Sequence, residues 1–162
     1  MAREEAHSKR HAARLAAVQA IYQMELTGDD AESVAQEFCE HRFGELAAEE
    51  TEPDKAFFID LVRGVPRHQV EIDHSIADDL SEDWQLQRID SILRAILRAG
   101  IYELVARKDV PAKVVIDEYL DIAHAFFTGE EAAFVNALLD RVAHRKRPLE
   151  FGESLPDDAL RF

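Results

Sequence analysis

The sequence predicts an all-α protein of about seven helices in two small packed bundles, and three observations support this fold class. Val, Ile, Leu and Phe recur at spacings of three and four residues, which is typical of amphipathic helices, and no stretch alternates as a strand does. Glycines and prolines stand where helices are expected to end or begin. Apolar residues make up 47% of the 162 residues. They suffice for a conventional core, because a chain of this length buries ~70% of its unfolded surface.

The first bundle is expected to span residues 8–80 and to contain four helices. These are predicted over residues 8–27 before Gly28, from a cap at Asp29 or Asp30 to Gly44, from Pro53 to Gly64, and from Pro66 to Leu80. The polar, acidic residues 45–52 are expected to form a loop. Residues 81–84, which include Trp84, are expected to separate the two bundles.

The second bundle is expected to span residues 85–147 and to contain three helices. Its first helix has a broad apolar stripe formed by Ile89, Ile92, Leu93, Ile96, Leu97, Ile101 and Leu104. Pro111 and Gly129 mark the turns on either side of the next helix, because the residue before a proline is pushed out of helical geometry and glycine readily ends a helix. Residues 1–147 thus form the helical domain, and residues 148–162 are predicted to be an acidic, partly ordered tail.

Composition excludes several classes of protein. No apolar run approaches the ~18 residues of a membrane span, and the N-terminus lacks the apolar centre of a secretory signal. We therefore expect a cytoplasmic protein without a membrane role. Cys39 is the single cysteine, which rules out an internal disulfide and a thiolate zinc cage.

Catalysis and metal binding are not expected. Glu71-x-x-His74 and Asp121-x-x-His124 have the spacing of a di-iron helical site, but such ligands must project into the bundle core. Apolar residues occupy the core side of both helices, so these four side chains are predicted to face solvent. No glycine-rich phosphate loop follows a strand. We predict no catalytic residue, no metal and no cofactor.

The distribution of charge indicates a localised anionic partner. The net charge is −14, yet residues 6–24 contain no acid and carry Lys9, Arg10 and Arg14, with His7 and His11 nearby. Residues 25–60, by contrast, contain twelve acids and two bases. The bases are expected at the N-terminal end of the first helix, where free backbone N–H groups would bind an anion together with them. Three charges supply only a modest, salt-dependent affinity for RNA, so further contacts or a partner would be needed.

The basic residues also have structural interpretations, which the sequence leaves open. The bases of the first helix could be stray charges on a solvated arm. Arg94 and Arg98 lie one turn apart and either join an RNA surface or pair with neighbouring acids. A further basic run ends the last helix, where cations are favoured in any case, and consists of Arg141, Arg145, Lys146 and Arg147.

Several stretches of the chain resemble the NusB family. They are Lys9 to Tyr22 (KRHAARLAAVQAIY), Ala95 to Leu104 (AILRAGIYEL), Asp109-Val110-Pro111, Lys113 to Ile116 with Glu118, and Phe134 to Asp140 (FVNALLD). The resemblance implies an all-helical, non-enzymatic factor that binds boxA-type single-stranded RNA of ribosomal-RNA leaders and helps RNA polymerase read through terminators. It also implies a partner, the small-subunit ribosomal protein NusE, within the RNA polymerase antitermination complex.

The resemblance assigns roles to particular residues. Those implied to bind RNA are Lys9, Arg10, His11 and Arg14 on the first helix, with Arg98 and Phe126 extending the surface. Those that fall where the family meets its partner are Tyr22, Glu130 and Phe134, of which Tyr22 and Phe134 are equally compatible with the core. The sequence departs from the family at His11 and Ala12, which stand at positions that are commonly basic.

Two other functions stay open on the sequence. The N-terminal domain of ribosomal-RNA cytosine methyltransferases resembles the NusB fold, so the chain could be the RNA-targeting domain of a modifying enzyme. A generic helical interaction module is the other alternative. Both a monomer and a homodimer are compatible with the sequence.

Overall fold

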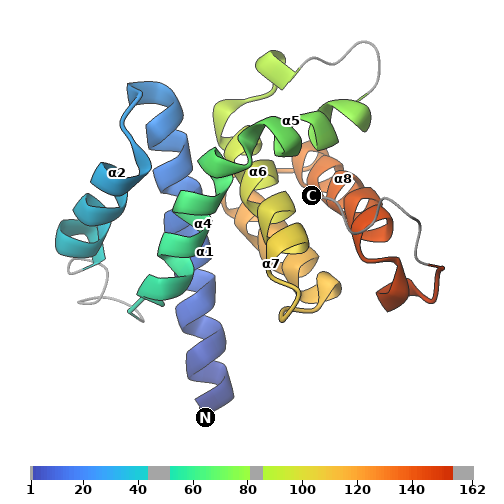
Figure 1. The fold of residues 1–162 in the computed structure, drawn as a ribbon, viewed down its shortest axis with the longest axis horizontal. Coiled ribbons are helices and arrows are strands. Elements are labelled where there is room, and N and C mark those ends of the chain that lie inside the picture. The colour runs from blue at the N-terminus through green and yellow to red at the C-terminus, as the bar shows by residue number, and fades with distance from the viewer. Residues whose placement is uncertain (1, 44–51, 81–85, 155–162) are drawn as a thin grey trace. The chain divides into compact units, whose positions relative to one another are not determined.

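The computed structural model describes residues 2–43, 52–80 and 86–154, and within these ranges it contains seven α-helices and no strand (Figure 1). The α-helices are α1 (Ala2–Thr27), α2 (Ala31–Glu37), α4 (Lys55–Arg67), α5 (Gln69–Asp78), α6 (Ser91–Ala106), α7 (Ala112–Phe126) and α8 (Glu130–Lys146). Shorter helical segments are η1 (Phe38–Arg42), η2 (Leu86–Arg88) and η3 (Pro148–Phe151). The prediction of an all-α fold is confirmed. The predicted helix end at Gly44, the predicted loop as far as Thr51 and the predicted break at residues 81–84 lie outside the described ranges.

Contacts between Cα atoms divide the chain into two compact units, Met1–Arg67 and His68–Phe162. The sequence placed this division later, at residues 81–84, and so put the helix before it in the first bundle. In the structure that helix, α5, belongs to the second unit and packs on α6. An ion pair between Asp73 of α5 and Arg98 of α6 joins the two helices, and the local sequence does not predict this pair.

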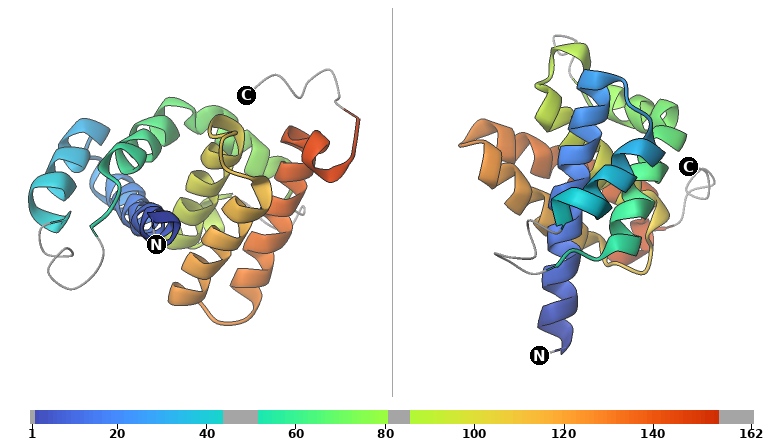
Figure 2. Two further views of the ribbon diagram at one scale, coloured as in Figure 1. Left: turned by 90° about the horizontal axis from the view of Figure 1, so that it is seen from below. Right: turned by 90° about the vertical axis from the view of Figure 1, so that its left-hand side faces the viewer.

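In the first unit, α1 lies alongside α4, and α2 packs on both helices (Figure 2). Alanines on α1 allow close packing, because a methyl side chain keeps the helix surfaces near each other; Ala13, Ala17 and Ala20 are fully buried. In the same unit, the buried rings of Phe38, Phe43 and Phe58 pack against one another, with centroids 4.8 to 6.4 Å apart. Offset and edge-on aromatic contacts of this kind add to the stabilisation from buried area.

Two predicted helix boundaries in the first unit were wrong. Helix α1 begins at Ala2 rather than near Ser8, since no helix breaker precedes Ser8 and the acids Glu4 and Glu5 suit a first turn. Helix α4 does not stop at Gly64 but continues through Pro66 to Arg67. The next helix, predicted to open at Pro66, therefore begins at Gln69 instead. Gly64 and Val65 are both buried, so tertiary packing maintains the helix where the local sequence favours an end.

In the second unit, α7 and α8 pack against α6 and against each other. Every residue of α6 from Leu93 to Leu104 is buried, which fits the apolar stripe predicted there. Asp90 caps α6 by accepting a hydrogen bond from the Ile92 amide at 2.8 Å. Gly100 allows the closest approach: a Cβ at this position would lie 3.1 Å from two carbons of Leu139. The segment Pro148–Phe151, predicted as part of the tail, follows α8 as a short 3-10 helix.

Candidate nucleic-acid interface

The bases predicted to bind RNA share α1 but differ in exposure. Lys9 is exposed, and Arg10 and His11 are half-buried. Arg14, one turn after Arg10, is only 2% exposed and ranks among the largest fully buried side chains of the described chain. Of these four bases, Lys9, Arg10 and His11 therefore reach solvent, while Arg14 is held inside.

Phe57 of α4 lies beneath both arginines. The guanidinium carbons of Arg10 and Arg14 lie 4.7 and 4.9 Å from the centroid of the Phe57 ring. A cation over an aromatic face is attracted by the ring quadrupole, so this ring orients both side chains. Sequence reasoning missed Phe57, because a phenylalanine at helical spacing within α4 reads as an ordinary core residue.

Asp54, the residue before α4, is an acid that contacts this cluster. Its carboxylate Oδ2 lies 3.9 Å from Nε of Arg10, and both side chains are about one-third exposed. Its backbone N–H donates to the Lys9 carbonyl at 3.0 Å. Sequence reasoning missed Asp54 as well, since this contact joins segments far apart along the chain.

The bases do not stand at a helix N-terminus, and that prediction was wrong. Because α1 begins at Ala2, its free backbone N–H groups lie in the turn that carries Glu4 and Glu5. Lys9 and Arg10 come about two turns later, where each backbone N–H bonds within the helix. Any attraction for an anion at this surface therefore comes from side-chain charge and not from helix-end N–H groups.

Arg98 and Arg94 of α6 are both engaged inside the second unit. Arg98 donates to both carboxylate oxygens of Asp73, from Nε at 2.9 Å and from Nη2 at 3.1 Å, and is 7% exposed. Arg94 donates to the carbonyls of Leu86 and Ile89 and to the Ser91 hydroxyl. Of the two interpretations that the sequence left open, the pairing of Arg98 with an acid is the one that the structure shows.

Three other predicted residues lie at the end of α7 and the beginning of α8. Phe126 ends α7 and is 39% exposed, which is unusual for a large aromatic side chain. Glu130 begins α8 and is exposed, and Phe134 lies one turn further along α8 and is half-buried. Tyr22 is half-buried on α1, in the first unit.

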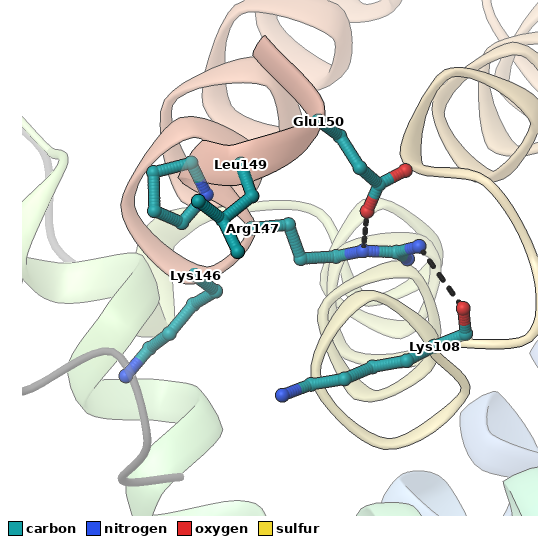
Figure 3. Close-up of a pocket in the computed structure, with 6 residues that line it drawn as sticks. Lys108, Lys146, Arg147, Leu149 and Glu150 are labelled. Carbon is teal, nitrogen blue, oxygen red and sulfur yellow. Dashed lines mark hydrogen bonds and ion pairs between the residues drawn. The ribbon is translucent and has the colours of Figure 1, made fainter. Parts of the chain in front are cut away.

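The arginines at the end of α8 also pair with groups inside the second unit. Arg141 and Arg145 both pair with Asp79, at 3.5 and 3.2 Å. Figure 3 shows Arg147 beside Glu150 and the Lys108 carbonyl, at a small pocket that Lys146 and Leu149 also line. Arg147 donates to the Val110 carbonyl at 2.6 Å as well, so the start of the predicted tail is fastened to the turn before α7.

The described part of the chain offers little for catalysis. It contains no group of three or more His, Cys, Asp or Glu side chains that could hold a metal ion. Burial raises the pKa of the Cys39 thiol, which keeps it protonated and weakly nucleophilic at neutral pH. None of the helices described is long and apolar enough to cross a membrane.

Fold and site together define a small all-α protein that exposes bases on α1. Its buried arginines Arg94, Arg98 and Arg147 bond within the second unit. The model of the NusB family matches residues 11–144, and the chain belongs to this family. This membership confirms the resemblance seen in the sequence.

Relatives with curated names and solved structures agree with the family match. Proteins named Transcription antitermination protein NusB from Maricaulis maris and Nitrobacter hamburgensis are 53% and 54% identical, covering 88% and 89% of this chain and 90% and 91% of their own lengths. The structure is similar to that of T. maritima NusB, with a TM-score of 0.72 and 31% identity over 88% of this chain and 96% of that one. It is also similar to the solution structure of NusB from Aquifex aeolicus, with a TM-score of 0.65 and 25% identity over 93% and 97%. These relatives are antitermination factors and not enzymes, in agreement with the absence of catalysis expected from the sequence.

Proposed function

We propose that the chain is a cytoplasmic transcription antitermination factor that binds boxA-type single-stranded RNA of ribosomal-RNA leaders together with NusE. It would act within the antitermination complex of RNA polymerase, either as a monomer or from a homodimer. The observation that carries the proposal is the acid-free stretch of α1, residues 6–24, in a member of the NusB family. Bases concentrated in a chain of net charge −14 favour one localised anionic partner.

Lys9, Arg10 and His11 are the residues proposed to contact RNA from α1. Lys9 is exposed, and Arg10 keeps about one-third of its side chain accessible while Phe57 fixes its direction. A preoriented guanidinium loses less conformational freedom when it binds a phosphate. Arg14 is too buried for direct phosphate contact in this conformation, so its proposed part is indirect, through the ring that it shares with Arg10.

Arg98 and Phe126 are proposed to contribute from the second unit in different ways. The Arg98 guanidinium is already paired with Asp73, and a phosphate would have to displace that carboxylate. Its proposed part is therefore to hold α5 and α6 in place. Phe126 is exposed and can stack on an unpaired base, an interaction that contributes about 1–3 kcal/mol in single-stranded complexes.

NusE is proposed to dock at Glu130, Phe134 and Tyr22. Glu130 offers an exposed charge for specificity, and Phe134 and Tyr22 each keep part of an aromatic side chain accessible. With RNA held by both proteins, the second contact becomes intramolecular, so the joint complex is expected to bind more tightly than either protein alone. The acidic remainder of the chain discourages indiscriminate RNA binding by like-charge repulsion.

The test is a titration of fluorescent boxA RNA and of a scrambled RNA, with and without NusE. The variants are Lys9→Ala and Arg10→Ala, and the control is Arg67→Ala. Arg67 is an exposed base of the same unit at the other end of α4, roughly 18 Å along the helix from Lys55. The control removes one positive charge, as each single variant does, without touching the α1 surface.

The double variant Lys9→Ala/Arg10→Ala is expected to weaken boxA binding about tenfold or more. Each lost phosphate contact should reduce the slope of log K against log salt by about 0.7. NusE should tighten binding of boxA RNA more than that of the scrambled RNA. Absence of RNA binding in both conditions would contradict the proposal. Binding that ignores both NusE and the boxA sequence would favour an RNA-targeting domain of another kind.

A further inference from the structure

We infer that Asp54 restrains the RNA affinity of α1, because its carboxylate occupies the place beside Arg10 that an RNA phosphate would take. Asp54 then acts as an internal competitor that lowers the affinity of α1 for any RNA backbone. The inference rests on the proposed RNA-binding function, and it concerns a residue that the family resemblance did not single out.

The backbone places Asp54 at the base cluster. Its N–H donates to the Lys9 carbonyl at 3.0 Å, so the residue is fixed beside the turn of α1 that carries Lys9 and Arg10. The Phe58 N–H donates to the Asp54 carbonyl at 3.0 Å, which anchors the residue to the first turn of α4. The backbone of Asp54 is thus held by one hydrogen bond to α1 and one to α4.

The two carboxylate oxygens of Asp54 have different contacts. Oδ1 accepts a hydrogen bond from the Phe57 N–H at 3.1 Å, which caps the start of α4. Oδ2 lies 3.9 Å from Nε of Arg10, whose guanidinium rests on the Phe57 ring. The cap therefore directs the second oxygen toward Arg10, and the cap itself requires only one oxygen and no negative charge.

Accessibility makes the carboxylate a competitor and not only a structural counter-ion. Side-chain exposures of 35% for Arg10 and 34% for Asp54 leave both groups within reach of a ligand from solvent. A phosphate that approaches Arg10 then meets a nearby negative charge, and at this exposure the repulsion is reduced by solvent but not abolished. The repulsion acts on any RNA backbone, so Asp54 lowers affinity without regard to sequence. Base contacts elsewhere must then supply the difference between boxA and other RNA.

The decisive variant is Asp54→Asn, since asparagine keeps an oxygen for the Phe57 N–H and removes the charge. Its matched control is Asp30→Asn. Asp30 caps α2 in the same way, accepting from the Ser33 N–H at 2.8 Å, and the two variants have equal net charge. Asp30 follows the far end of α1, and the helix from Arg10 to Thr27 alone is about 25 Å long, beyond the ~10 Å screening length at 0.1 M salt.

Asp54→Asn is expected to tighten binding of boxA RNA and scrambled RNA alike, by about 3- to 10-fold at low salt, while Asp30→Asn leaves both nearly unchanged. The gain should shrink as salt is added. Asp54→Ser, a second uncharged cap residue, should behave in the same way, and thermal melts of all variants check that the fold is kept.

Other results would overturn the inference. If Asp54→Asn matched Asp30→Asn while Arg10→Ala still weakened binding, Asp54 would not compete, and the proposed function would stand. If both Asp54 variants bound RNA more weakly at an unchanged melting temperature, Asp54 would position Arg10 and not oppose RNA. If wild type and every variant failed to bind either RNA, the proposed function would fall with the inference.

Discussion

Basic side chains in the two compact units differ in what they contact. On α1 of the first unit, Lys9 is exposed, and Arg10 has an acid 3.9 Å away and a ring beneath it. In the second unit, Arg98 is paired through two hydrogen bonds with Asp73, and Arg147 is buried against carbonyls. Arginines that look alike in the sequence thus differ in the structure: some stay accessible to a ligand, and others are buried and bonded to internal partners.

Arg14 differs from Lys9 and Arg10 in the first unit because its side chain is buried. It belongs to the basic run of α1, yet it is at least as buried as Arg94, Arg98 and Arg147 of the second unit. A guanidinium over Phe57 keeps its charge while its long side chain packs against apolar surface. Position within a basic run therefore does not show that a side chain is available to a ligand.

Arg98→Ala is expected to have the largest effect on stability. The change leaves Asp73, which is 24% exposed, without its partner, and it empties a buried site. Because removal of one member of a buried pair strands the other charge, the free energy of unfolding should fall by about 2–3 kcal/mol in denaturant titrations. Arg10→Ala is the matched change on α1 and should alter it by less than about 1 kcal/mol. An equal loss in the free energy of unfolding for the two variants would contradict the proposed difference between the arginines of the two units.

Glu150→Ala is expected to have an intermediate effect. The Ala112 N–H, at the start of α7, donates to Oε1 of Glu150 at 2.9 Å, so a residue beyond α8 satisfies the end of another helix. Loss of this carboxylate also removes the ion-pair partner of the buried Arg147, so the free energy of unfolding should fall by about 1–2 kcal/mol. Glu150→Gln, which keeps an acceptor, should lower it less. Amide hydrogen exchange at the first turn of α7 would locate the effect, and unchanged exchange there would contradict it.

Arg63→Gln is expected to have the smallest effect on stability and a clear effect on a pKa. Arg63 donates to both carboxylate oxygens of Glu32, and this hydrogen bonding holds the pKa of Glu32 below its ordinary value of 4.5. A lowered pKa in the folded state stabilises the protein above the unfolded pKa, and this contribution is lost as the pH falls through the folded value. In Arg63→Gln the Glu32 pKa should rise toward 4.5, as NMR titration of the carboxyl group would show. An unchanged pKa would mean that the pair does not form in solution.

The difference between sequence neighbours and contacts across the fold limits what could be predicted about the site. The acid-free stretch of α1 was visible because the charges are neighbours in the sequence. The acids that face the bases were not: Asp73 is 25 residues from Arg98 and Asp79 is 66 residues from Arg145. Helical periodicity assigns a residue to a face of its own helix, but it does not say which other segment covers that face.

By itself the sequence determined the all-α class, the order of the helices, the concentration of bases on α1 and the membership of the NusB family, because each of these is a local pattern of residue types. Tertiary structure decided which bases stay accessible, how far α4 continues past Gly64 and which unit holds α5. Each of those outcomes depends on burial and on ion pairs between distant segments, whose free energies outweigh local preference. Lys9 and Arg14 show this most directly, since they are neighbours in one basic run, and packing around Phe57 leaves one exposed and the other enclosed.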